Sequence, residues 1–300
     1  MGLLEGKVAI VTGAGRGLGR EEALALAAEG ARVIVNDIGV SVAGEGTDQT
    51  PAAQVVQEIK TGGGDATTNF EDVASWDGAG RAVAQAYDTY GQLDIVVNNA
   101  GVLRDRMNFN MTEDEFDLVM RVHCKGHFAV TRHACVRWRE LAKQTGQIFG
   151  RVINTSSEAG LMGTAGNSNY AMAKAAIAAL TVSIAREMGK YGVTSNFMAP
   201  RARTRMTDTM PNSTLFAKPE SGFDQFNPAW PAQLVVFLAS PAAADINGQG
   251  FIVWGGEVSL LKGWHPIRHI STPQAAFTAH DLIKRKDELF GDASRQPTYF

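Results

Sequence analysis

Short apolar segments alternate with longer, alanine-rich segments along most of the chain. The apolar segments are rich in β-branched residues, which is typical of strands buried on both faces of a parallel sheet; they are Val8–Val11, Val33–Val35, Ile95–Val97, Val152–Ile153 and Phe251–Val253. The segments between them have helical patterns and include Leu18–Ala28, Ala79–Tyr90, Asp114–Arg139 and Tyr170–Lys190. Strands and helices in alternation predict right-handed crossovers and a doubly wound α/β sheet.

Two long loops interrupt this alternation. The stretch from Gly39 to Pro51 is long for a strand-to-helix connection, and such loops tend to be functional or mobile. The second stretch, residues 201–231, is predicted to form a substrate lid, with a surface excursion or a subunit contact as the alternative. Its prolines include Pro211, Pro219 and Pro228, and its phenylalanines are Phe216, Phe223 and Phe226.

The C-terminal residues follow neither pattern. We predict one α/β domain over residues 1–262, which contains the lid, and an extension over residues 263–300 that packs on the domain or on a neighbouring subunit. Thr278–Phe290 is predicted to be a short helix, and its mixed charges between Ile283 and Glu288 are most simply a solvated face.

Composition narrows the possible partners. The 300 residues are 45% hydrophobic and 20% charged, and 28 basic against 31 acidic residues give a net charge of −3. This balance disfavours binding to nucleic acid or to an anionic membrane. Two cysteines, Cys124 and Cys135, are too few for a disulfide framework. No signal-peptide pattern or apolar run of about 20 residues is seen, so a cytoplasmic protein without a membrane span is expected.

A glycine-rich turn, Thr12-Gly-Ala-Gly-Arg-Gly-Leu-Gly19, follows the first predicted strand and opens the first predicted helix. Gly13, Gly17 and Gly19 lack side chains, so the backbone can approach a pyrophosphate closely, while the helix N-terminus offers unpaired N–H groups. We therefore predict a dinucleotide site that includes this turn and Leu18.

Three further segments complete the predicted cofactor site. Asp37 ends the second strand, where a carboxylate accepts hydrogen bonds from ribose hydroxyls but repels a 2′-phosphate, so NAD is favoured over NADP. Arg16 tempers this preference, because it can either contact a phosphate or remain solvated. The adenine is expected beside Asp72 and Val73, and the end of the fourth strand, with Asn99, Ala100 and Gly101, is expected to close on the cofactor.

Candidate chemistry lies in Ser157, Tyr170 and Lys174. Tyr170 and Lys174 are four residues apart and therefore share one face of a helix. A free tyrosine has a pKa of about 10, and a neighbouring ammonium is expected to lower that pKa toward the range of a working acid or base. Ser157 would orient the substrate oxygen. These residues predict hydride chemistry on a nicotinamide cofactor.

Together these motifs resemble the short-chain dehydrogenase/reductase family over roughly residues 5–260. The resemblance implies a single-domain Rossmann fold with a seven-stranded parallel sheet, and a homodimer or homotetramer built on long helices. It implies that Tyr170 is the acid/base, that Ser157 positions the carbonyl, and that Lys174 contacts the nicotinamide ribose while lowering the tyrosine pKa. Pro200 and Thr204 would flank the nicotinamide.

One position departs from the family pattern. Where the family usually has an asparagine that helps to hold a water in the proton relay, this chain has His123. The same substitution resembles the (3R)-hydroxyacyl-CoA dehydrogenase unit of peroxisomal multifunctional β-oxidation enzymes. An imidazole can still accept and donate hydrogen bonds, so the relay is expected to survive with an altered pH dependence. His123 and His127 are spaced like two metal ligands, but no third ligand accompanies them, and no metal is expected.

Three arginines, Arg201, Arg203 and Arg205, alternate at the start of the predicted lid. Guanidinium groups suit phosphates and carboxylates, so we expect Arg201 and Arg203 to bind an anionic acyl carrier such as coenzyme A. Salt bridges to the protein's own acids are the alternative.

The expected reaction is the interconversion of a secondary alcohol and a ketone. The favoured substrate is a 3-hydroxyacyl-CoA, and a steroid-derived acyl group is one form that its acyl chain could take. A hydroxysteroid dehydrogenase and a 3-oxoacyl carrier-protein reductase are the nearest alternatives within the enzymes. A nucleotide-binding scaffold without catalysis is the alternative from another class.

Overall fold

The structure is a computed structural model that describes residues 2–208, 213–263, 266–271 and 276–294. It contains two compact units, Met1–Leu261 and Lys262–Phe300. All the predicted site residues belong to the first unit.

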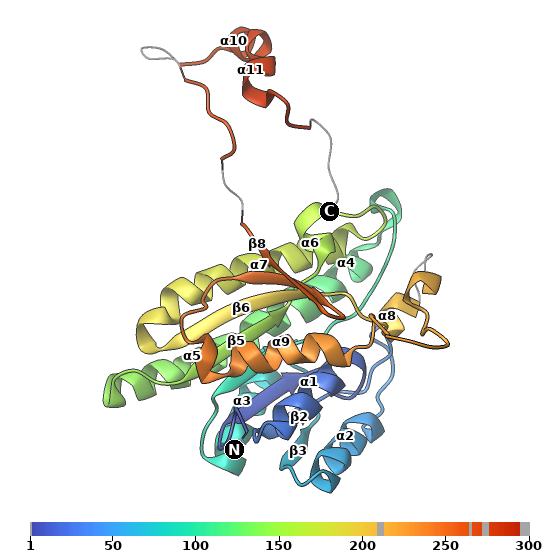
Figure 1. The fold of residues 1–300 in the computed structure, drawn as a ribbon, viewed down its shortest axis with the longest axis vertical. Coiled ribbons are helices and arrows are strands. Elements are labelled where there is room, and N and C mark those ends of the chain that lie inside the picture. The colour runs from blue at the N-terminus through green and yellow to red at the C-terminus, as the bar shows by residue number, and fades with distance from the viewer. Residues whose placement is uncertain (1, 209–212, 264–265, 272–275, 295–300) are drawn as a thin grey trace. The chain divides into compact units, whose positions relative to one another are not determined.

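An eight-stranded sheet forms the centre of the first unit (Figure 1). Its strand order is β3-β2-β1-β4-β5-β6-β7-β8. The strands are β1 (Val8–Thr12), β2 (Arg32–Asn36), β3 (Ala66–Asn69), β4 (Ile95–Asn98), β5 (Gly150–Thr155), β6 (Val193–Pro200), β7 (Gly250–Trp254) and β8 (Glu257–Leu261). The doubly wound sheet predicted from the apolar runs is confirmed, and each of those runs lies within a strand.

The last strand corrects the expected count of seven. Strands β1 to β7 are parallel, whereas β8 runs antiparallel to β7. Gly255 and Gly256 join the two strands, and Gly255 has a φ of +48°, which a glycine adopts without a steric penalty. The alternating Val258 and Leu260 are exposed, so β8 lacks the fully buried apolar run that marks the other strands.

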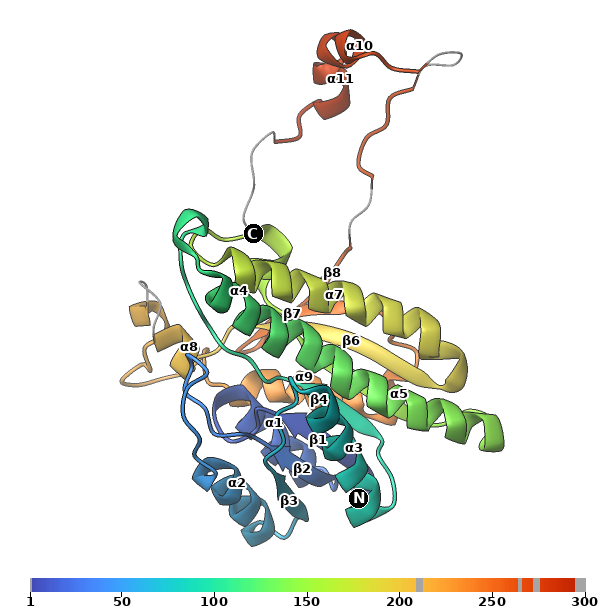
Figure 2. The same cartoon turned by 180° about the vertical axis from the view of Figure 1, so that it is seen from behind.

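Helices cover both faces of the sheet (Figures 1 and 2). They are α1 (Gly17–Ala28), α2 (Thr50–Thr61), α3 (Trp76–Tyr90), α4 (Glu113–Met120), α5 (Gly126–Thr145), α6 (Glu158–Met162), α7 (Ser168–Met188), α8 (Arg205–Asp208) and α9 (Ala229–Ala239), with short 3₁₀ helices at Asn108–Asn110, Gly189–Tyr191, Ser213–Phe216 and Pro241–Ala243. One buried cluster packs α1, α2 and α9 against the sheet. A second packs α3, α5 and α7 against the opposite face, where Figure 2 shows α5 and α7 side by side.

The helix predicted over Asp114–Arg139 is interrupted. It begins at Glu113, where Thr112 forms a capping box with Glu115, and a π-helical turn at Arg121–Lys125 separates α4 from α5. A π turn inserts one extra residue into a helix and is frequently found at functional sites. This insertion changes which side chains of the segment face the sheet edge.

The predicted lid contains α8 and the 3₁₀ helix Ser213–Phe216, while Pro211 lies outside the described residues. The helix predicted at Thr278–Phe290 is two short helices, α10 (Ala279–Lys284) and α11 (Lys286–Phe290). In the part of the chain that the structure describes, no helix is long and apolar enough to span a membrane.

Candidate active site

A cavity of about 420 Å³ lies at the carboxyl edge of the sheet. Its walls come from the residues after β1, β2, β4, β5 and β6, which lie far apart in the sequence. Strands β1 and β4 are neighbours although β2 and β3 follow β1 in the chain, so the cavity opens at the point where the strand order reverses. Ligands of doubly wound sheets bind at this point.

The glycine-rich turn forms one end of the cavity. Gly13 has a φ of +65°, and a Cβ there would lie 2.8 Å from the Cα of Ala100. Asn99 donates from Nδ2 to the carbonyls of Thr12 and Gly13, at 3.0 and 3.2 Å. The missing side chain of Gly13 and the Asn99 amide thus hold the turn close against the end of β4. Gly17 and Leu18 lie on the cavity wall.

The turn fits a dinucleotide pyrophosphate. Gly17 has a φ of +55°, and a Cβ there would be in van der Waals contact with Thr204, 3.7 Å from its Cγ2. Helix α1 begins at this glycine, which lines the cavity, so the unpaired N–H groups of the helix lie at the cavity wall. The turn therefore offers the bare backbone and the charge preference that a pyrophosphate needs.

Asp37 and Arg16 lie on the cavity wall beside this turn. The Asp37 carboxylate accepts hydrogen bonds from the backbone N–H groups of Gly15 and Gly39, at 2.8 and 2.7 Å. The Arg16 guanidinium forms an ion pair with Asp48 at 2.8 Å. The guanidinium is therefore held toward the loop that follows β2, and its charge is offset within the protein.

The predicted adenine-side residues also line the cavity. Val73 is buried, and Asp72 pairs with Arg121 of the π turn at 3.0 Å. Pro200 and Thr204 lie on the wall where β6 leads into the lid.

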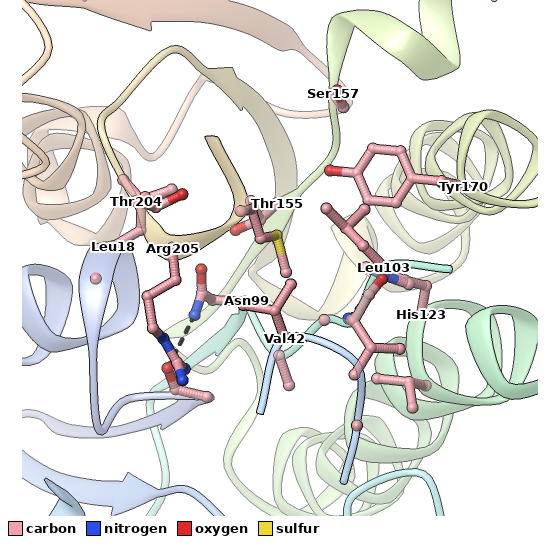
Figure 3. A pocket seen from close by; sticks show the side chains of 18 of the residues that line it. Leu18, Val42, Asn99, Leu103, His123, Thr155, Ser157, Tyr170, Thr204 and Arg205 are labelled. Carbon is pink, nitrogen blue, oxygen red and sulfur yellow. Dashed lines mark hydrogen bonds between the residues drawn. The ribbon is translucent and has the colours of Figure 1, made fainter. Parts of the chain in front are cut away.

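Ser157 and Tyr170 lie together at the other end of the cavity (Figure 3), and Lys174 also lines it. Ser157 caps α6, and its Oγ accepts a hydrogen bond from the Ala159 N–H. Gly160 allows α6 to pack closely on α7, since a Cβ there would lie 2.5 Å from the backbone of Ala175. This close packing brings the serine beside the tyrosine.

Burial, and not the neighbouring ammonium, dominates the pKa of Tyr170. Desolvation raises that pKa to about 12, a hydrogen bond with Ser157 lowers it, and the negative charge of Asp105 raises it further. The Lys174 Nζ lies 5.4 Å from the centre of the phenol ring and donates to the Thr155 carbonyl at 2.6 Å. The expectation that Lys174 brings the tyrosine pKa below its ordinary value is therefore wrong for this structure.

Lys174 is itself desolvated. Burial lowers its pKa to about 7, while the nearby Cys124 and Glu22 raise it. The Ser156 hydroxyl donates to the Lys174 backbone carbonyl at 2.8 Å. The amine is thus fixed by β5 and titrates near neutral pH, so it can accept or release a proton there.

His123 lies in the π turn and packs edge-on against Tyr170, with ring centres 5.3 Å apart. Its Nε2 lies 2.9 Å from the Val102 carbonyl, and its buried Nδ1 has no hydrogen-bond partner among the described residues. Burial, followed by the charge of Lys174, lowers its pKa to about 3. A Cβ on Gly101 would overlap the imidazole, so that glycine makes room for a neutral histidine.

His127 is buried behind His123, with ring centres 6.3 Å apart. Within the described residues, no group of three His, Cys, Asp or Glu side chains is arranged to hold a metal ion.

Arg201 and Arg203 have internal partners. Arg201 pairs with Glu158 and stacks on Trp254, 4.1 Å from the ring centre. Arg203 pairs through both nitrogens with Asp224. The alternative of salt bridges to the protein's own acids therefore describes these two side chains in the structure.

The sequence model of the protein family described as short chain dehydrogenase matches residues 7–214 of this chain. The chain belongs to this family. It is 46% identical over 303 residues to hydroxyacyl-CoA dehydrogenase ChsB1 of Mycobacterium tuberculosis, an alignment that covers 98% of this chain and 91% of that protein. It is 40% identical over 258 residues to the mouse peroxisomal multifunctional enzyme type 2, covering 86% of this chain but only 33% of that longer protein.

A solved structure gives the same result. The short chain dehydrogenase from Mycobacterium avium is 44% identical, superposes with a TM-score of 0.86, and matches 99% of this chain and 98% of its own. As a short chain dehydrogenase, the protein is an oxidoreductase that acts on hydroxyl groups with a nicotinamide cofactor.

Several residues that line the cavity of this dehydrogenase were not predicted from the sequence. Thr155, Asp105 and Val42 line the cavity, and Leu103 donates its backbone N–H to the Val42 carbonyl at 3.0 Å. The long loop after β2 therefore forms part of the wall. Its length was a signal, but no motif marked Asp105 or the carbonyl that anchors Lys174.

Proposed function

We propose that the protein interconverts a 3-hydroxyacyl-CoA and the 3-oxoacyl-CoA with NAD as the hydride carrier. The observation that carries this proposal is one cavity that contains both the glycine-rich turn and the Tyr170 hydroxyl. The name of the relative that aligns over nearly its full length supports the substrate class. Apolar side chains on the cavity wall, including Leu103, Leu118 and Phe216, suit an aliphatic or steroid-derived acyl group.

Tyr170 and Ser157 act on the substrate oxygen. When bound, the nicotinamide supplies the hydride acceptor and, in its oxidised form, a positive charge. In oxidation the Tyr170 oxygen takes the proton of the substrate hydroxyl, and in reduction the phenol returns it. The Ser157 hydroxyl orients the same oxygen. A phenol with a pKa near 12 carries its proton at neutral pH, so Tyr170 is already in the protonation state that reduction needs.

Lys174 and His123 are proposed to form the proton relay that serves Tyr170. The Lys174 amine is held at the Thr155 carbonyl and titrates near neutral pH. His123 remains neutral and keeps an unpartnered Nδ1 within the described part of the chain, so it can hold a water by accepting or donating one hydrogen bond. The relay would therefore use a neutral imidazole in place of the usual amide.

NAD is proposed over NADP because of the charges beside the ribose end. Asp37 presents a carboxylate to the cavity, and Arg16 is already paired with Asp48. A 2′-phosphate there would meet a negative charge without a free Arg16 to offset it. This argues against the carrier-protein reductase that uses NADPH.

The test is a comparison of Tyr170→Phe with the wild-type enzyme. NADH oxidation with acetoacetyl-CoA should fall by about three orders of magnitude or more, since the acid/base is lost, while NADH binding should persist. Tyr191→Phe, which changes a tyrosine outside the cavity, should leave the rate unchanged. Wild-type protein that binds NADH but reduces no acyl-CoA, steroid or simple ketone would instead support the scaffold alternative, and preference for a free steroid would support a hydroxysteroid dehydrogenase.

We also propose a homodimer or homotetramer in the cytoplasm. Exposed apolar side chains on α5 and α7, such as Phe128 and Met172, support self-association. Both cysteines are free thiols, which suits a reducing compartment.

A further inference from the structure

The three alternating arginines of the lid differ in their partners. Arg201 pairs with Glu158, and Arg203 pairs with Asp224. The Arg205 side chain, by contrast, has no hydrogen bond or ion pair within the residues that the structure describes. An arginine side chain is always charged, and its fork of donors suits phosphates. The lid therefore presents one guanidinium that no carboxylate holds in an ion pair, although the charge of Asp37 acts on it.

Arg205 lies at the cofactor end of the cavity. It lines the cavity at the start of α8, directly after Thr204, whose Cγ2 lies 3.7 Å from where a Cβ on Gly17 would be. Figure 3 shows its side chain on the side of the pocket where Leu18 and Asn99 lie, away from Tyr170 and Ser157. The charged groups that influence Arg205 are Arg16 and Asp37, both of which belong to the cofactor side.

Those two neighbours are already engaged. Arg16 is held by Asp48, and Asp37 accepts two backbone N–H groups. The positive end of α1 and the Arg205 guanidinium are therefore left facing the same space from opposite sides, one from the sheet edge and one from the lid. Two such groups converge on an anion.

We propose that Arg205 binds the cofactor pyrophosphate from the lid side, so that an occupied cofactor site holds α8 over the cavity. This inference rests on the proposed dinucleotide site, and it makes Arg205 a positioning residue for the lid. A 2′-phosphate is the less favoured partner because Asp37 stands where that group would lie. The phosphates of coenzyme A are also less favoured, because a long pantetheine arm separates them from the reacting carbon.

The test measures binding in the absence of turnover. Arg205→Met keeps most of the side-chain length and removes the charge, and Lys218→Met removes a lysine from the same segment that does not line the cavity. Calorimetric titration of each variant with NADH, ADP-ribose, adenosine, NADPH and coenzyme A separates the possible phosphates. A thermal melt of each variant checks that it is folded.

Loss of one charge-assisted contact should weaken NADH and ADP-ribose binding by about tenfold or more in Arg205→Met. Adenosine binding and the Lys218→Met variant should be unchanged, and Arg205→Lys should recover part of the affinity. Unchanged NADH affinity in Arg205→Met overturns the inference, as does a loss confined to NADPH or to coenzyme A. Because these are equilibrium measurements, the inference can hold even if the acyl-CoA reaction is not found, whereas wild-type protein that binds no dinucleotide would defeat both proposals.

Discussion

Desolvation sets the protonation states around Tyr170. It raises the tyrosine pKa to about 12 and lowers the pKa of Lys174 to about 7 and that of His123 to about 3. At neutral pH the phenol and the imidazole are therefore both uncharged, and only the amine is close to its midpoint. The active site therefore keeps Tyr170 protonated at neutral pH, and the phenolate becomes abundant only at high pH.

The pH dependence of alcohol oxidation should follow the charge of Asp105. This carboxylate lines the cavity and raises the pKa of Tyr170, so Asp105→Asn should move the rising limb of kcat/KM for oxidation to lower pH. We expect the variant to oxidise a 3-hydroxyacyl-CoA about threefold faster at pH 8. Asp114→Asn, on the exposed first turn of α4, is the matched control. A limb that stays in place in Asp105→Asn would show that this charge does not reach the phenol.

Glu22 makes stability depend on pH. Both of its carboxylate oxygens are buried without hydrogen-bond partners among the described residues, and burial raises its pKa from 4.5 to about 8. Because the folded state holds this proton more tightly than the unfolded state, folding is not penalised below about pH 4.5. The free energy of unfolding then falls as pH rises toward 8, by at most about 5 kcal/mol.

Glu22→Gln keeps the shape and removes the titration. Its melting temperature should therefore exceed that of the wild type at pH 9, and the difference should shrink as the pH is lowered to 5. Glu21→Gln, whose parent carboxylate pairs with Arg20 and is less buried, serves as the control. Parallel pH curves for wild type and Glu22→Gln would contradict this account.

At the scale of elements, the sequence predicts best what a local pattern encodes. The runs at β1, β2 and β4 are buried at every position or nearly so, and their composition reveals this directly. Strand β3, Ala66–Asn69, has two partly exposed threonines and a terminal asparagine, so it carries little apolar signal. The π turn that places His123 leaves no local mark, because the inserted residue is accommodated by packing of α4 and α5 against α7.

The candidate site divides in the same way. Ser157, Tyr170 and Lys174 could be found because their spacing within the chain reflects the chemistry. The partners of Arg201 and Arg203 are 43 and 21 residues away, and no spacing rule links them. The sign of the Tyr170 pKa was mistaken for a related reason, since the degree of desolvation depends on segments such as the loop after β2 that sequence motifs do not place.

At the scale of the whole molecule, one apolar surface is covered by no described element of the first unit. Phe128 lines a groove between α5 and α7 with Cys124, Ala176, Ile177 and Leu180. On the same two helices, Val136, Leu141 and Met172 are exposed by 37%, 43% and 53%. Exposed apolar area on this scale usually marks an interaction site, and a second copy of the same two helices would cover it in a self-complementary contact.

Phe128→Glu tests this contact. A carboxylate desolvated at a symmetric interface appears twice, so the variant should dissociate into a species of half the mass or less, as measured by light scattering after size-exclusion chromatography. Phe109→Glu is the control, because Phe109 is 79% exposed in the 3₁₀ helix Asn108–Asn110 and does not line this groove. Since Phe128 does not line the catalytic cavity, NADH binding by the smaller species reports whether each subunit holds a complete cofactor site. Equal masses for Phe128→Glu and wild type, or a monomeric wild type, would exclude this surface as the subunit interface.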